Sequence, residues 1–126
     1  KIKCDILYLD PPYNERDYNR YYHLPETVSR GIIPEPVGKS GMFTANSTRS
    51  DYNSRQAGAA FKDLLKNAHA QCIIFHYTDN GLVKIQDART ILKQKGDVEE
   101  FYFDCKGYNT TYTASKCQHH IFKVIV

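Results

Sequence analysis

Four consecutive residues near the start of the chain combine groups that can bind an amine on a planar ring: Asp10, Pro11, Pro12 and Tyr13. Asp10 offers a carboxylate acceptor and Tyr13 an aromatic face. The prolines have a fixed φ and no N–H group, so the backbone is stiff here and presents only carbonyl acceptors. Such a set suits the exocyclic amine of a nucleobase, or an amide. The alternative is an ordinary turn, because Asp-Pro and Pro-Pro often only end a strand.

A strand must position this motif, and the chain has the pattern for one. An apolar run precedes Asp10, and three later runs also resemble strands. Apolar residues at helical spacing fall between them, with Gly31 expected to end the first helix and Thr78 or Asp79 expected to cap the last. The expected strands are residues 3–9, 72–75, 97–105 and 119–126. The expected helices are residues 19–30, residues 54–68, and a third helix whose apolar stripe runs from Leu82 to Leu92 and which Gly96 closes.

The order of these elements predicts an α/β fold. Strands that alternate with helices are typical of parallel units. The last two strands have no helix between them, so we expect a mostly parallel sheet with a final antiparallel hairpin. Ligands of such sheets bind at the carboxyl ends of the strands. Residues 10–13 and 76–79 should therefore share one edge, and Lys106 and Tyr108 should join them if residues 97–105 run parallel to the first two strands.

Length, composition and charge narrow the class of protein. The chain has 126 residues, enough for one modest domain, and no starting Met, which favours a fragment of a longer protein. We find no apolar run near the roughly 20 residues of a membrane span and no signal peptide, so no membrane is expected. The formal net charge of +3 is compatible with DNA as a partner.

The cysteines favour buried free thiols over a disulfide framework or a zinc site. They are widely spaced, with no Cys-x-x-Cys pair, which weakly favours a cytoplasmic protein. The pair His119-His120 resembles a metal pair, but no third ligand stands near it in the sequence, so no metal is expected. The four cysteines are Cys4, Cys72, Cys105 and Cys117.

Residues 10–14, followed by Arg16, Tyr18 and Tyr22-His23-Leu24, resemble the DNA adenine-N6 methyltransferases. Those enzymes use S-adenosylmethionine and carry an Asp/Asn-Pro-Pro-Tyr/Phe motif after their fourth strand. The resemblance implies a partial Rossmann-like methyltransferase sheet, of which this chain supplies the fourth to seventh strands. Residues 1–126 would then be the carboxyl-terminal part of the catalytic domain, with residues 31–54 as a long polar loop within it.

One feature of that family is not found in the sequence. The cofactor motif, a strand followed by a Phe-x-Gly-x-Gly turn, has no counterpart, and no strand precedes the nearest glycine pair at residues 38–41. We therefore expect the cofactor motif on a missing amino-terminal half of the same enzyme or on a partner subunit. The fragment alone is expected to be inactive.

The resemblance implies site-specific methylation of the N6 amino group of adenine in DNA, in a restriction-modification setting. Asp10 and the Pro11 carbonyl would accept the two N–H protons, with Pro12 keeping the turn rigid. Tyr13 would stack on a base flipped out of the duplex, and Asp10 and Tyr13 would also contact the cofactor. The candidates for DNA contacts, each also readable as ordinary surface or packing, are Asn14, Arg16, Tyr18, Lys39, Arg49, Lys106 and Tyr108.

Two rival interpretations remain open on the sequence. Similar motifs methylate amino groups of RNA or glutamine side chains of proteins, although the tyrosines and arginine after the motif favour DNA. Alternatively, the chain is an inactive half-domain that needs a partner carrying the cofactor motif.

Overall fold

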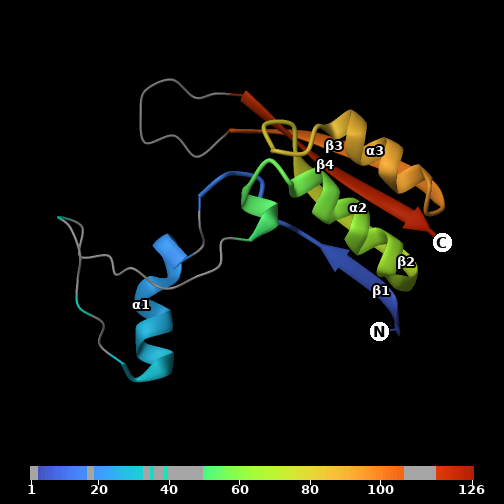
Figure 1. The fold of residues 1–126 in the computed structure, drawn as a ribbon. Helices are drawn as coiled ribbons and strands as arrows, with labels where there is room; N and C mark the ends of the chain where they lie inside the picture. The colour runs from blue at the N-terminus through green and yellow to red at the C-terminus, as the bar shows by residue number, and fades with distance from the viewer. Residues whose placement is uncertain (1–2, 17–18, 33–34, 36–38, 40–49, 107–115) are drawn as a thin grey trace.

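The computed structural model describes residues 3–16, 19–32, 35, 39, 50–106 and 116–126. Within these residues, four strands, three α-helices and one short 3₁₀ turn follow each other in the mixed order expected of an α/β protein (Figure 1). They are β1 (Lys3–Leu9), α1 (Asn19–Arg30), η1 (Asp51–Asn53), α2 (Ala57–Asn67), β2 (His69–Thr78), α3 (Ile85–Lys93), β3 (Asp97–Lys106) and β4 (Lys116–Ile125).

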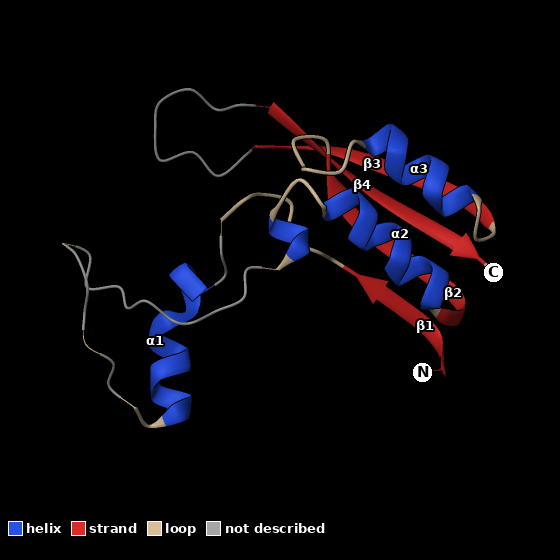
Figure 2. Ribbon diagram, in the orientation of Figure 1, coloured by secondary structure: helices blue, strands red, loops and turns tan. Residues whose placement is uncertain are grey.

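The strands form one sheet in the order β1-β2-β4-β3. β1 pairs with β2 in parallel, and β4 pairs antiparallel with both β2 and β3. The final antiparallel hairpin is confirmed, whereas a mostly parallel sheet is not, because β4 lies between β2 and β3 and makes two of the three ladders antiparallel (Figure 2). Phe122 and Val124 of β4 are completely buried, in keeping with the central position of this strand.

Both α2 and α3 cover the same face of this sheet (Figure 1). Ala57, Phe61 and Leu65 recur every four residues, so they lie along one side of α2 and are buried. The Phe61 ring stacks on Phe75 of β2 with centroids 4.3 Å apart. This packing forms the core that holds the carboxyl ends of β1 and β2 in place.

The expected elements are found with shifted ends. The helix expected over residues 54–68 is shorter, because the backbones of Ser54 and Ala68 are extended. Residues 51–53 form the separate turn η1 before it, in which the Ser50 hydroxyl accepts a hydrogen bond from the Tyr52 N–H. β2 is longer than the run 72–75, and β4 begins three residues before residue 119. Helix α1 matches residues 19–30, and Gly31, with a φ of 63°, ends it as expected.

The expected cap of α3 is wrong. The helix begins at Ile85, with Lys84 in the capping position, and neither Thr78 nor Asp79 reaches it. Asp79 instead accepts a hydrogen bond from the Gln118 N–H of β4 at 3.1 Å and donates its own N–H to the Gln118 carbonyl at 3.0 Å. Within the described residues, no helix is both long and apolar enough to cross a membrane.

Candidate active site

The Asp-Pro-Pro-Tyr turn lies where β1 ends, at the carboxyl edge of the sheet. Leu9 pairs with Phe75, so Asp10 comes level with His76 of β2. The carboxylate Oδ1 lies 3.5 Å from His76 Nδ1, and the Asp10 side chain is 52% exposed. Tyr13 is 48% exposed, while both prolines are half-buried. The acceptor and the ring therefore remain open to a ligand while the prolines are held by the protein.

A backbone hydrogen bond connects the turn to the rest of the molecule. The Tyr13 carbonyl accepts a hydrogen bond from the Leu82 N–H at 3.1 Å, which ties the motif to the turn that follows β2. That turn is itself closely packed, because the Tyr77 hydroxyl accepts from the Val83 N–H at 3.3 Å. Burial is the main cause that raises the pKa of the Tyr77 hydroxyl, which therefore stays protonated.

Asn53 holds the loop that follows the motif. Its amide Nδ2 donates to the carbonyls of Asn14 at 2.9 Å and Arg16 at 3.0 Å, and the residue is only 2% exposed. The Asn14 side chain also accepts from the Arg16 N–H at 3.0 Å. Sequence reasoning missed Asn53, which fell within the polar stretch 31–54. The available signal was the Ser-Asp-Tyr-Asn turn directly before a helical pattern.

A line of side chains extends from Asp10 across three strands. His76 Nδ1 lies 3.4 Å from the Tyr8 hydroxyl, and His76 Nε2 lies 2.8 Å from His119 Nδ1. Only one nitrogen of such a facing pair carries the shared proton. The Asp10 carboxylate and the Tyr8 hydroxyl both face Nδ1 of His76, so His76 connects the motif to His119. The sequence placed His76 at the edge of the site but gave no sign of its pairing with His119.

The predicted DNA contacts are brought together only in part. Asn14 and Arg16 lie in the loop after the motif, and Lys39 is exposed. β3 runs in the same direction as β1 and β2, because both β2 and β3 are antiparallel to β4, so Lys106 ends its strand at the same edge as Asp10. The remaining candidates, Tyr18, Arg49 and Tyr108, lie outside the described residues.

The two neighbouring histidines of β4 point to opposite faces, as alternation along a strand requires. His120 lies on the helix-covered face, 7% exposed, with Nδ1 2.9 Å from Glu100 Oε1. Glu100 also accepts two hydrogen bonds from the Arg89 guanidinium, one on each carboxylate oxygen, at 2.7 and 2.8 Å. These Arg89 bonds are the main cause that lowers the pKa of the Glu100 carboxyl. His120 is thus part of a structural ion-pair network.

An exposed carboxylate and an exposed aromatic ring thus stand together at the carboxyl end of a parallel strand. The sequence profile of D12 class N6 adenine-specific DNA methyltransferases matches residues 1–91, which contain this site. The chain therefore belongs to that family. No solved structure matched the chain.

Individual relatives are named as modification enzymes. The chain is 39% identical over 95 residues to the modification methylase StsI of Streptococcus sanguinis, covering 75% of this chain and 14% of that protein. It is 35% identical over 120 residues to the type II methyltransferase M.FokI of Planomicrobium okeanokoites, covering 94% and 18%. It is 36% identical over 96 residues to the type II methyltransferase M.NlaIII of Neisseria lactamica, covering 75% and 28%. The chain thus spans less than a third of each of these relatives.

Proposed function

We propose that the protein carrying this chain transfers a methyl group from S-adenosylmethionine to the N6 amino group of adenine in DNA. The observation that carries this proposal is the half-exposed Asp10 carboxylate next to the Pro11 carbonyl and the exposed Tyr13 ring, in a chain of this family. In this proposal the catalytic residues are Asp10, Pro11, Pro12 and Tyr13.

The role of these residues is to orient the amine. S-adenosylmethionine, when bound, supplies an electrophilic methyl group. The lone pair of an adenine amine is delocalised into the ring, so the enzyme must hold the N–H groups in a fixed direction. Asp10 accepts one N–H and the Pro11 carbonyl the other, and the Tyr13 ring stacks on the base, a contact worth about 1–3 kcal/mol. Orientation of this kind lowers barriers by up to about 7–11 kcal/mol in ideal cases.

The fit of this chain to the cofactor is partial. Asp10 and Tyr13 are open and suit the reactive end of S-adenosylmethionine. No glycine-rich turn follows β1, β2 or β3 among the described residues, so the cofactor motif would stand elsewhere in the protein or on a partner subunit. We propose that β1, whose Ile6 and Tyr8 are 66% and 59% exposed, adjoins the rest of a larger Rossmann-like sheet. Titration calorimetry should then detect cofactor binding by the intact protein and none at micromolar concentration by residues 1–126 alone.

The DNA contacts are also proposals. A duplex must release its adenine into the site, which requires base flipping, and the basic side chains would hold the phosphates on either side. Arg16 and Asn14 follow the motif directly, and Lys39 and Lys106 would extend the contact, as would Tyr18, Arg49 and Tyr108.

Methyl transfer from labelled cofactor to DNA, transfer RNA and protein tests the proposal. The intact protein should label DNA at N6 of adenine, and Asp10→Ala should reduce the rate by about 10²–10³-fold, as loss of one preorganised polar contact does elsewhere. Asp5→Ala is the matched control, because Asp5 is an exposed carboxylate on the same strand. Label found only in RNA or protein would refute the DNA assignment, and full activity of Asp10→Ala would refute the assigned role.

A further inference from the structure

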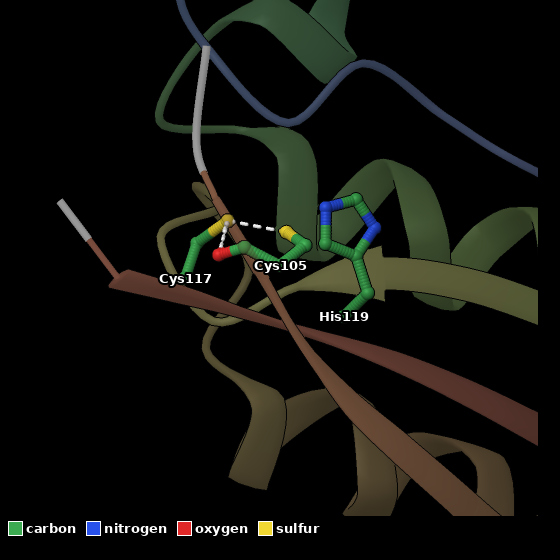
Figure 3. Close-up of side chains that lie close together, drawn as sticks. All are labelled: Cys105, Cys117 and His119. Atoms are coloured by element: carbon green, nitrogen blue, oxygen red, sulfur yellow. Dashed lines mark hydrogen bonds between the residues drawn. The ribbon is translucent and has the colours of Figure 1, made fainter. Parts of the chain in front are cut away.

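Three side chains that could hold a metal ion meet where β3 ends and β4 begins, on the face that the helices leave uncovered. Cys105 and Cys117 are directly opposite each other in the ladder, and their sulfur atoms lie 2.7 Å apart. His119 is two residues beyond Cys117 on β4, so its side chain lies on the same face. One ligand atom from each residue falls within 4.8 Å of the others (Figure 3).

A small shift of these atoms would let them bind one ion. Tetrahedral zinc with Zn–S of about 2.3 Å and Zn–N of about 2.0–2.1 Å places its ligand atoms roughly 3.3–3.8 Å apart. The two sulfur atoms would have to separate by about 1 Å from their present hydrogen-bonded contact, which rotation of a cysteine side chain provides. Two thiolates and an imidazole are ligands that zinc accepts and that magnesium and calcium do not.

His119 is already oriented as a metal ligand. Its Nδ1 is engaged by His76 Nε2 at 2.8 Å, and its ring packs on Phe103 with centroids 5.6 Å apart. Figure 3 shows the other edge of the ring turned toward the two sulfur atoms. Histidines that bind metals almost always use their second nitrogen in a hydrogen bond that fixes the ring, and His76 supplies that bond here.

We propose that Cys105, Cys117 and His119 bind one Zn²⁺ ion, with a fourth position left for water or another ligand. His76 is a positioning residue for this site. The ion would bind His119, and His119 contacts His76 through a hydrogen bond. His76 would thus contact the metal ligand with one ring nitrogen and face the Asp10 carboxylate with the other. A disulfide between the two cysteines would use neither histidine, and for this reason the metal is the better account of the whole cluster.

Cobalt binding by the intact protein, reduced and freed of metal by a chelator, tests the proposal. One equivalent of Co²⁺ should bind and give a sulfur-to-cobalt charge-transfer band with the visible bands of tetrahedral cobalt, and Zn²⁺ should displace it. Cys117→Ser and His119→Asn should abolish these bands. Cys4→Ser is the matched control and should leave them unchanged. His76→Ala should weaken Zn²⁺ binding by about 10–100-fold, as loss of the partner of a ligating histidine does.

A second measurement needs no variant and decides the matter if a variant does not fold. Bound Zn²⁺ should protect Cys105 and Cys117 of the unmutated protein from alkylation, with peptide mass spectrometry locating the modified thiols. Absence of cobalt bands while both thiols remain reactive would overturn the proposal. A Cys105–Cys117 disulfide in protein purified without reductant and without metal would overturn it equally, as would cobalt bands that persist in a folded Cys117→Ser variant.

Discussion

Replacing Asn53 by aspartate should release the loop that follows the Asp-Pro-Pro-Tyr turn. The Asn53 side chain is 2% exposed, and its Nδ2 donates to two backbone carbonyls, those of Asn14 and Arg16, at 2.9 and 3.0 Å. Aspartate has nearly the same shape as asparagine but an acceptor where Nδ2 stands. The substitution therefore turns two hydrogen bonds into two repulsive contacts without changing the volume of the core.

The expected magnitude follows from these contacts. Asn53→Ala removes two neutral hydrogen bonds, each worth about 0.5–1.5 kcal/mol, so it should lower the free energy of unfolding by about 1–3 kcal/mol. Asn53→Asp adds a buried charge facing two carbonyls and should cost about 3–5 kcal/mol. Methylation by the intact protein should fall in the same order, because the loop begins directly after Tyr13.

Chemical unfolding and methyl-transfer rates of the two variants measure these effects. Asn67→Ala is the matched control for Asn53→Ala, because Asn67 is exposed and its Nδ2 donates to the carbonyl and the carboxylate of Asp63 in its own helix, at 2.9 and 3.2 Å. This control should change the free energy of unfolding by about 0.5 kcal/mol or less. If Asn53→Asp were no more destabilising than Asn53→Ala, the donor role assigned to Nδ2 would be refuted.

Three further predictions concern the parts of the protein around the site. Gly81→Ala would place a methyl group 2.2 Å from the buried Tyr77 ring and should lower the free energy of unfolding by about 1–3 kcal/mol. Gly58→Ala in α2 meets nothing within 4 Å and should instead raise the free energy of unfolding by about 0.5–1 kcal/mol. Equal effects of the two substitutions in chemical unfolding would contradict this packing. Because the pKa of Glu100 is lowered in the folded protein, this residue stabilises the fold above its ordinary pKa of 4.5, and the stabilisation is lost as the pH falls through the folded pKa. Glu100→Gln should therefore weaken the loss of unfolding free energy at acid pH, and should do so more than Glu99→Gln at a 61% exposed position. An unchanged dependence of the unfolding free energy on pH in Glu100→Gln would argue against the assignment. The hydrogen bond with Cys117 is the main cause that raises the pKa of the Cys105 thiol from 9.0 to about 11. In chelator-treated protein, Cys117→Ala should therefore speed alkylation of Cys105 by up to about 100-fold near neutral pH. An unchanged alkylation rate would show that the partner thiol does not raise this pKa.

The local pattern of the sequence was enough to predict the elements that carry the motif. An apolar run followed by Asp-Pro-Pro-Tyr predicts a strand that stops at a rigid turn, and the structure has β1 ending at Leu9. Apolar residues every three or four positions placed α1, α2 and α3, because helix formation in these segments depends on neighbours close in the chain. No helical pattern separates the last two expected strands, and this absence predicted the antiparallel hairpin of β3 and β4.

The order of the strands was decided by the tertiary structure alone. The strand that lies between β2 and β3 is the one whose position there buries most apolar surface in the whole sheet. No local pattern in the sequence contains that information. The same applies to Asp79, predicted as a helix cap, because its partner on β4 is 39 residues away at Gln118.

The order of residues along the chain was enough to predict the family and the place of the motif: a carboxylate, two prolines and a ring at the end of a strand. The surroundings of these residues depend on contacts between distant parts of the chain. Asn53 reaches the loop after the motif across 37 to 39 residues, and His76 meets His119 across 43. Hydrogen bonds between residues this far apart in the chain depend on the packing of the whole sheet, which fixes distances that spacing along the sequence does not.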